Sequence, residues 1–184
     1  MKSRVIGGLL AIALLIALLP ARFAVAAVFI VRHAEKQSEA NEKEVPLSEA
    51  GRARARRLAE VLRDAKIAAI YSTDTVRTRA TAEPLARAGR LTPQLYDANG
   101  PDAASLLAAR IAKEHGGENV LVVGHSNTVG PLVAALGCAD EVRVGPREYD
   151  GLWIVIPASS AGGAASASAP GPSAGGSTLL RLRL

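Results

Sequence analysis

The stretch Val28-Phe29-Ile30-Val31-Arg32-His33-Ala34-Glu35-Lys36 decides how this chain folds. Its first four residues are apolar, and a short apolar run bounded by polar residues predicts a buried strand, although periodicity alone does not exclude a helix. Such a strand delivers Arg32 and His33 to one edge of a sheet. In open α/β sheets, ligands bind at the carboxyl ends of the strands. The alternative is an Arg and a His that only cap a strand at the surface.

A second stretch, Asn119-Val120-Leu121-Val122-Val123-Gly124-His125-Ser126-Asn127, repeats this design with a His at the end of an apolar run. The chain has three histidines, and two of them occupy this position. The third, His115, precedes two glycines at the end of a predicted helix, where a cation is typical of helix capping. The repeated design favours a ligand site that contains both His33 and His125.

Four motifs follow one another along the chain, and together they resemble the histidine phosphatase superfamily. That family includes the phosphoglycerate mutases and many small phosphatases. Ala34 stands where the family usually has Gly, a change common in its short phosphatase members. The resemblance covers residues 28–153. The motifs are Arg32-His33-Ala34-Glu35, Leu47-Ser48-Glu49-Ala50-Gly51, Tyr71-Ser72-Thr73 with Arg77-Thr78-Arg79-Ala80-Thr81-Ala82, and Val123-Gly124-His125-Ser126.

Arg32, Arg77 and His125 form the predicted phosphate site. Guanidinium groups stay protonated and bind phosphate oxygens with paired hydrogen bonds, and an attacking imidazole must be neutral, which two nearby positive charges favour. The residues alone do not say which His is attacked. The resemblance implies that His33 is the nucleophile and that it becomes a transient phosphohistidine. We expect no metal or other cofactor.

The general acid that protonates the leaving oxygen is the open part of the site. The resemblance implies a Glu or Asp in the segment after the third strand, where Asp97 and Asp102 stand. Asp102 begins a predicted helix, where an Asp is expected for structural reasons, so we favour Asp97. Glu35 is a third candidate, since it lies two residues beyond His33. Some small phosphohistidine phosphatases of the family have no dedicated acid.

The N-terminus has the pattern of a targeting segment. Two basic residues precede an uncharged apolar stretch over residues 5–19, and Ala24-Val25-Ala26 fits the small-x-small cleavage pattern. We predict a signal peptide over residues 1–26, cleaved after Ala26, and a periplasmic or secreted protein. An uncleaved anchor is the alternative, but the apolar stretch is short for a membrane span, which needs about 20 residues.

The charge of the chain says little about partners. The formal charge of +5 falls to +2 without residues 1–26, with 19 basic against 17 acidic residues. The arginines between Arg52 and Arg63 alternate with apolar residues, which is typical of a solvated helix face, and few aromatic residues could stack on bases. We therefore expect no nucleic-acid partner and membrane contact only through the targeting segment. Cys138 is the single cysteine, which excludes an internal disulfide.

Alternating strands and helices predict an α/β fold, a three-layer α/β/α sandwich whose mostly parallel, mixed sheet has helices on both faces. One domain is expected over residues 27–184. It contains a flexible Ala/Gly/Ser/Pro-rich loop at 158–177, which joins hairpin strands at 152–156 and 178–184. The other predicted strands are 28–31, 67–71, 91–96 and 120–123, and the predicted helices are 48–65, 75–88, 102–114 and 127–136.

The leading function is a phosphatase that hydrolyses a phosphate ester or phosphohistidine on a small molecule or a phosphoprotein. A phosphomutase on the same fold is one alternative. A non-catalytic phosphate- or phosphosugar-binding protein is another. A metal-dependent hydrolase with His33, Glu35 and His125 as ligands is disfavoured, because Arg32 and Arg77 would repel a cation. The substrate and the oligomeric state stay open.

Overall fold

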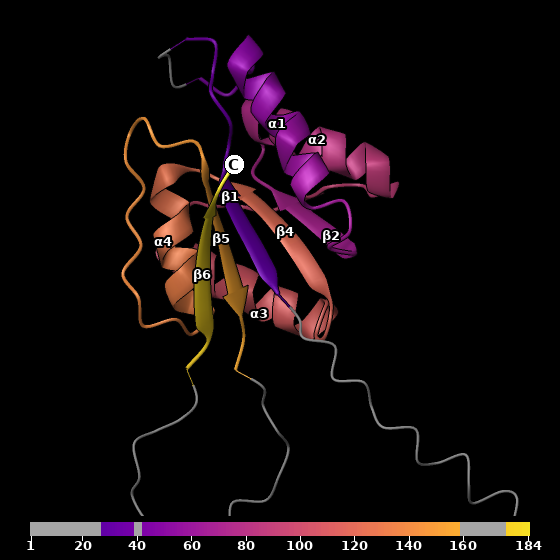
Figure 1. The fold of residues 1–184 in the computed structure, drawn as a ribbon. Coiled ribbons are helices and arrows are strands. Elements are labelled where there is room, and N and C mark those ends of the chain that lie inside the picture. The colour runs from indigo at the N-terminus through magenta and orange to yellow at the C-terminus, as the bar shows by residue number, and fades with distance from the viewer. Residues whose placement is uncertain (1–26, 39–41, 159–175) are drawn as a thin grey trace, which may run out of the picture.

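The computed structural model describes residues 27–38, 42–158 and 176–184, which form one sheet with helices on both faces (Figure 1). The predicted signal peptide and most of the predicted flexible loop lie outside these residues. In chain order the elements are β1 (Val28–Arg32), α1 (Glu49–Val61), β2 (Ile67–Ser72), α2 (Val76–Gly89), β3 (Gln94–Leu95), α3 (Ala103–Glu114), β4 (Asn119–Gly124), α4 (Ser126–Ala135), β5 (Gly151–Ile156) and β6 (Thr178–Arg183).

The six strands lie in the order β3-β2-β4-β1-β5-β6. The four strands from β3 to β1 are parallel, β5 is antiparallel to β1, and β6 is antiparallel to β5. The predicted α/β fold with a mostly parallel, mixed sheet is confirmed. β1 and β4 are neighbours at the centre, so their carboxyl ends lie side by side.

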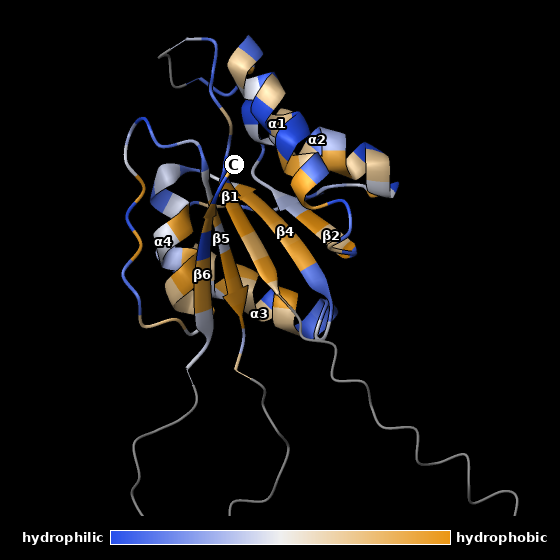
Figure 2. Cartoon of the chain, in the orientation of Figure 1, coloured by the Kyte–Doolittle hydropathy of each residue, from blue (hydrophilic) through white to orange (hydrophobic). Residues whose placement is uncertain are grey.

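Successive side chains of the central strands pack into two apolar layers, one on each face of the sheet. Val28 and Ile30 face α3 and α4, whereas Phe29 and Val31 face α1 and α2. Successive strand side chains point to opposite faces, and a strand that is apolar at every position is therefore covered on both sides. Figure 1 shows the two helix pairs on opposite faces, and Figure 2 shows the apolar residues of the central strands between them.

Two helix ends differ from the prediction. α1 begins after the expected N-cap Ser48, whose hydroxyl accepts a hydrogen bond from the Gly51 N–H, but it ends at Val61 rather than near residue 65. α2 includes Gly89, and Arg90 takes the left-handed conformation with φ of 53°. The helix predicted over residues 75–88 therefore extends one residue further. The left-handed conformation of Arg90 lets the Leu91 N–H reach the Ala86 carbonyl at 2.8 Å.

The two edges of the sheet differ in how well the sequence predicted them. β3 has only two residues where residues 91–96 were expected, and it pairs with β2 alone. β5 and β6 form the predicted hairpin, with Gly151 opposite Arg183 and Ile156 opposite Thr178. On one face of β6, Arg181 and Arg183 pair with Glu148 and Asp150. Within the described part of the chain, no helix is both long and apolar enough to span a membrane.

Candidate active site

β1 and β4 bring the two histidines together. Arg32 lies opposite Gly124 in the parallel register, and the His33 N–H donates to the Gly124 carbonyl at 2.9 Å. The His33 and His125 rings meet edge to face, with centroids 5.3 Å apart. The repeated pattern of an apolar run followed by a His thus produces one cluster at the carboxyl end of the sheet.

The His33 ring has one nitrogen occupied and one available. Its Nδ1 lies 2.8 Å from the Ala34 carbonyl oxygen, which can only accept, so in the neutral ring Nδ1 carries the hydrogen and Nε2 keeps its lone pair. The pKa of His33 is lowered to about 3, mainly by burial and also by the charges of His125, Arg32 and Arg77, whereas the Ala34 hydrogen bond acts in the opposite direction. The expected neutral imidazole is present, but burial contributes more to it than the guanidinium charges do.

Arg32 is held by the backbone that precedes β5. Its Nη1 lies 2.9, 3.0 and 3.2 Å from the carbonyl oxygens of Gly145, Pro146 and Glu148, respectively. The ring of Tyr149 covers the guanidinium, with Cζ 4.1 Å from the ring centroid. The Arg32 Nε is buried and has no partner among the described residues. Since buried donors are normally paired, this Nε is available for an oxyanion.

Arg77, on a helix, is likewise held by a backbone carbonyl and has an unpartnered Nε among the described residues. It stands in the first turn of α2, where free backbone N–H groups and the helix dipole favour anions. Its Nη1 donates to the Glu42 carbonyl at 2.8 Å, while its buried Nε also has no partner in the described structure. Burial and the charge of Arg32 lower the pKa of Arg77. Two buried guanidinium groups of like charge thus lie close enough to interact and have unused donors.

His125 is fixed by hydroxyl groups. Its Nε2 lies 2.8 Å from the Thr73 hydroxyl, and its backbone N–H donates to the Thr128 hydroxyl at 2.8 Å. The pKa of His125 is lowered to about 4, mainly by burial and also by the charges of Arg77 and Arg32. Thr73 follows β2, so three neighbouring parallel strands contribute to the cluster.

The three candidate acids occupy different surroundings. Glu35 forms an ion pair with Arg54, whose Nε lies 3.0 Å from both carboxylate oxygens. Burial alone would raise the pKa of Glu35, but the hydrogen bonds and charge of Arg54 bring it below its usual value. Asp97 is exposed, and its Oδ1 accepts from the backbone and side-chain N–H groups of Asn99. Asp102 is exposed and makes no side-chain hydrogen bond as the N-cap of α3.

The sequence pattern did not reveal three residues of this neighbourhood. Tyr149 covers Arg32, and its ring centroid lies 5.9 Å from that of His33. Thr73 holds His125, and Arg54 holds Glu35. Arg54 was included in the solvated helix face, yet it is only partly exposed. Thr73 could have been found because it belongs to the motif Tyr71-Ser72-Thr73. Tyr149 lies in an irregular segment, where no periodicity points to it.

The described residues contain no group of three or more His, Cys, Asp and Glu side chains that could hold a metal ion. Cys138 is buried, and burial followed by the charge of Asp140 raises the pKa of its thiol. A raised pKa disfavours the thiolate that a nucleophile or metal ligand requires. The donors that the structure gathers at the carboxyl ends of β1 and β4 suit an oxyanion.

Comparisons with known proteins agree with this geometry. Residues 28–98 match the model of the histidine phosphatase superfamily (branch 1). No curated protein has a sequence that matches significantly. Among solved structures, the protein histidine phosphatase SixA complexed with tungstate is similar at 23% identity and TM-score 0.64, over 85% of this chain and 96% of that one.

Two further structures share the fold. A mycobacterial glucosyl-3-phosphoglycerate phosphatase complexed with inorganic phosphate has 18% identity and TM-score 0.56, over 70% of this chain and 88% of its own. A phosphoserine phosphatase mutant from Entamoeba histolytica, in complex with phosphoserine, has 14% identity and TM-score 0.55, over 71% and 90%. Residues 28–98 thus match the histidine phosphatase superfamily, and the described structure shares the fold of these solved phosphatases.

Proposed function

We propose that the protein is a metal-independent phosphatase that hydrolyses a phosphate ester or phosphohistidine through a phosphohistidine intermediate on His33. The observation that carries the proposal is the pair of buried, unpartnered Nε donors on Arg32 and Arg77, beside a neutral His33 with a free Nε2. Guanidinium donors that are already fixed in place stabilise phosphoryl oxygens without reorganisation during the reaction.

The reaction has two steps. The Nε2 lone pair of His33 attacks phosphorus, forms an N–P bond and breaks the bond from phosphorus to the leaving group, which departs with a proton. Water then attacks the phosphohistidine, breaks the N–P bond and releases inorganic phosphate. Arg32, Arg77 and His125 bind the oxygens whose charge develops in both steps. The hydrogen bond from His33 Nδ1 to the Ala34 carbonyl supports the positive charge that the ring acquires.

The general acid is proposed to be Asp97. Glu35 suits this role poorly, because its ion pair with Arg54 favours the ionised carboxylate. Asp97 is exposed, has no ion pair in the described structure, and accepts hydrogen bonds only from Asn99. Asp97→Asn should then slow alkyl phosphates far more than aryl phosphates, whose leaving groups need less protonation. Equal slowing of both substrates would remove Asp97 from this role.

The substrate class follows from the same reasoning. A substrate with a good leaving group, such as an aryl phosphate or a phosphohistidine, depends least on an acid. The similar fold of a protein histidine phosphatase supports phosphohistidine as one candidate, and the fold of a glucosyl-3-phosphoglycerate phosphatase supports a small phosphorylated molecule. A phosphomutase would have to retain its phosphorylated intermediate, whereas a phosphatase admits water to it.

A comparison of two arginines on α2 tests the phosphate site. Arg77 is buried with an unpartnered Nε, whereas Arg79 is exposed and pairs with Asp74. Arg77→Gln should lower kcat/KM for an aryl phosphate by about 100-fold or more and weaken inhibition by inorganic phosphate. Arg79→Gln should change either value by less than about 3-fold, because exposed pairs contribute little.

The assay is run on alkyl and aryl phosphates and a phosphohistidine peptide, with and without chelator. Full activity in chelator is expected. Complete loss in chelator would support the metal-dependent alternative, and tight phosphate binding without turnover of any substrate would support the non-catalytic binding protein.

Export is a separate proposal, based on the sequence of residues 1–26. The mature protein would begin at Ala27, whose backbone N–H donates to the Asn119 side chain at 2.9 Å, directly before β1. N-terminal sequencing of protein from the periplasm or medium should therefore start at Ala27. Intact Met1 in the membrane fraction would favour the anchor.

A further inference from the structure

The leaving group must lie outside the cluster of histidines and arginines. In an in-line transfer, the leaving group and the attacking Nε2 of His33 stand on opposite sides of phosphorus. The phosphate oxygens occupy the Arg32 and Arg77 donors, so the rest of the substrate extends toward solvent. The surface around this end of the sheet therefore selects the substrate. This step rests on the function proposed above.

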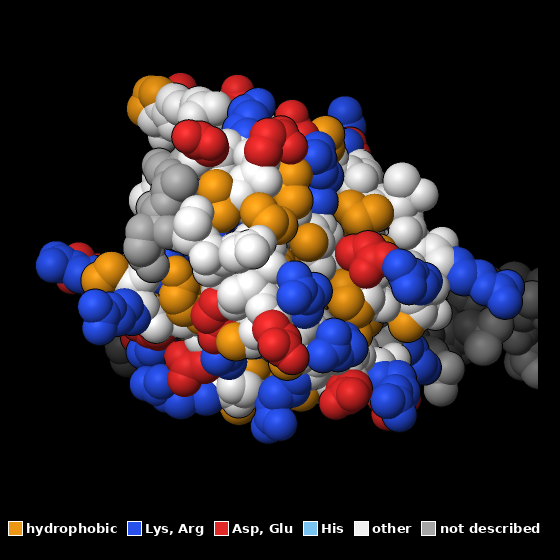
Figure 3. All heavy atoms as spheres, turned by 90° about the horizontal axis from the view of Figure 1, so that it is seen from above, with side chains coloured by type: hydrophobic (Ala, Val, Ile, Leu, Met, Phe, Trp, Pro, Cys, Tyr) orange, Lys and Arg blue, Asp and Glu red, His pale blue; other side chains and the backbone are white. Residues whose placement is uncertain are grey.

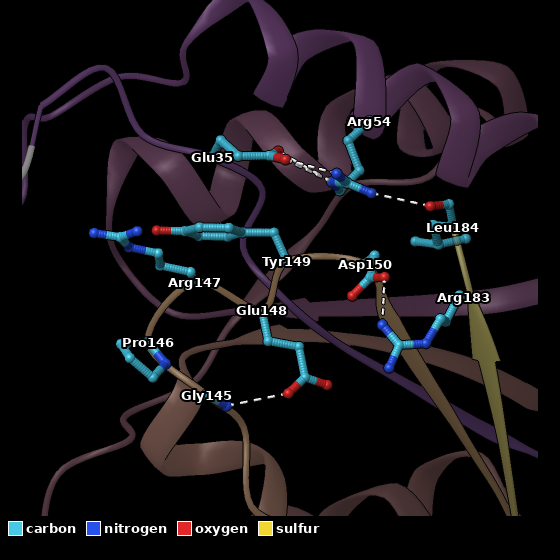
Figure 4. Close-up of a pocket in the computed structure, with 10 residues that line it drawn as sticks. All are labelled: Glu35, Arg54, Gly145, Pro146, Arg147, Glu148, Tyr149, Asp150, Arg183 and Leu184. Atoms are coloured by element: carbon cyan, nitrogen blue, oxygen red, sulfur yellow. Dashed lines mark hydrogen bonds and ion pairs between the residues drawn. The ribbon is translucent and has the colours of Figure 1, made fainter.

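A pocket of about 670 Å³ opens at this end, between the start of α1, the segment before β5 and the end of β6 (Figure 4). Tyr149 lines the pocket, and its ring is also 5.9 Å from the His33 ring and 4.1 Å from the Arg32 guanidinium. Glu35, two residues after His33, lines it as well. The pocket thus shares one wall with the candidate active site.

Another pocket, of about 450 Å³, lies between the starts of α3 and α4. It is lined by Tyr96, Asn127 and Thr128 among others, and its nearest described link to the cluster is the hydrogen bond between the Thr128 hydroxyl and the His125 backbone. No ring or guanidinium contact joins its lining residues to His33 or Arg32 in the described structure. Tyr96, Ala98 and Asn99, which flank Asp97, line this second pocket. The pocket beside Tyr149 is therefore the better candidate for a leaving group that departs without help from Asp97, such as that of an aryl phosphate or a phosphohistidine.

Most charged groups of the Tyr149 pocket already have partners. Glu35 pairs with Arg54, Asp150 with Arg183, and Glu148 with Arg181 from the neighbouring surface. Figure 4 marks the first two of these pairs with dashed lines. These pairs neutralise each other and leave no net preference for an ionic ligand.

Arg147 is different. It lines the same pocket, is exposed, and has no hydrogen bond or ion pair with any described residue. Its guanidinium and the hydroxyl of Tyr149 appear at the same end of the pocket in Figure 4. The view from above in Figure 3 shows basic and acidic side chains interspersed over this end of the molecule. An uncompensated positive charge at the mouth of the pocket would attract an anion.

We propose that the Tyr149 pocket receives the leaving group and that Arg147 selects substrates whose leaving group carries a second anion, a carboxylate or another phosphate. Tyr149 separates the two binding regions and offers its ring to the part of the leaving group nearest phosphorus. Arg147 lies beyond it and meets the distal anion. The phosphate itself is bound by Arg32 and Arg77, so Arg147 affects the choice of substrate and leaves the chemical step unchanged.

Binding of two phosphonates tests this proposal without relying on turnover. Phenylphosphonate and 4-phosphonobenzoate differ only in the distal carboxylate. The wild-type protein should bind 4-phosphonobenzoate about 3- to 5-fold more tightly at low salt, the range of an exposed ion pair. This preference should shrink as salt screens the charge.

Arg147→Gln should abolish the preference and leave the affinity for phenylphosphonate unchanged. Arg143→Gln is the matched control, because it removes the same charge from an exposed residue that pairs with Glu141 and does not line the pocket. Equal affinity of the wild-type protein for both probes, or a preference that survives Arg147→Gln, would overturn this inference without affecting the phosphate site. Failure of phenylphosphonate itself to bind would contradict the proposed function as well as the inference.

Discussion

At the scale of single residues, His33 is buried, and one of its ring nitrogens is held by a hydrogen bond. The Ala34 carbonyl holds Nδ1, and the remaining nitrogen faces a cluster that contains two guanidinium groups and a second imidazole. A protonated imidazole in this place would lose much of its hydration and would be repelled by the two guanidinium groups. The neutral form is therefore the resting form of the ring, as the proposed attack by Nε2 requires.

A titration of the ring nitrogens by NMR tests this description. Since the pKa of His33 is about 3 and that of His125 about 4, both rings should stay neutral from pH 8 down to about pH 5. An unperturbed His titrates near pH 6.5, so the unfolded chain binds these protons first. Stability should consequently fall as the pH drops from about 6.5 toward 4. A His33 titration midpoint near 6.5 in the folded protein would contradict the buried site.

The residues of the site differ in how far the sequence could reveal them. Arg32, His33 and His125 stand at the ends of apolar runs, and the strand period alone brings them to one edge. Arg77 was found from a motif and from its place at a helix start. Tyr149 could not be found, because it lies in an irregular segment whose contact with Arg32 arises only when β5 pairs with β1.

At the scale of elements, α1 and the segment after β1 are joined at one close contact. The Glu35 carbonyl accepts from the Ser48 N–H at 2.9 Å, and a Cβ on Gly51 would stand 2.1 Å from that carbonyl oxygen. Only glycine allows this approach. The contact places Glu35 and the start of α1 beside each other, close to His33.

Two Gly→Ala substitutions distinguish the steric requirement at Gly51 from the general effect of Ala on helix stability. Gly51→Ala should lower the free energy of unfolding by about 1–3 kcal/mol or more, because backbone must move to relieve the clash. Gly89→Ala in α2 meets only the flexible Leu91 side chain at 3.3 Å, so it should stay within about 1 kcal/mol of wild type. Denaturant unfolding measures both. Equal stability of the two variants would mean that α1 does not approach Glu35 as described.

Elements with strong periodicity were predicted well, and those fixed by tertiary contacts were not. The central strands and the β5–β6 hairpin appear where apolar runs and alternation indicated them. β3 is shorter than expected, because its pairing is limited to two residues of β2. The end of α2 shifted to Arg90, because local hydrogen bonds rather than residue type decide which residue takes the left-handed conformation.

At the scale of the whole molecule, the central sheet brings together site residues that are far apart in the sequence. Residues near positions 32, 77 and 125 come from segments far apart in the chain, and they meet because β1, β2 and β4 are parallel neighbours. The C-terminal end of β6 reaches the same end of the molecule, where Arg54 donates to the Leu184 carbonyl at 3.0 Å (Figure 1). The proposed chemistry depends on this convergence.

Trapping the intermediate tests the central claim most directly. After incubation with ³²P-labelled substrate and quenching without acid, wild-type protein should carry label that is stable to base and lost in mild acid, as expected of a phosphoramidate. His33→Ala should carry no label and show no turnover, whereas His125→Ala should retain some label, because His125 binds oxygens and does not form the N–P bond. Label that persists in His33→Ala, or turnover in that variant, would contradict the account.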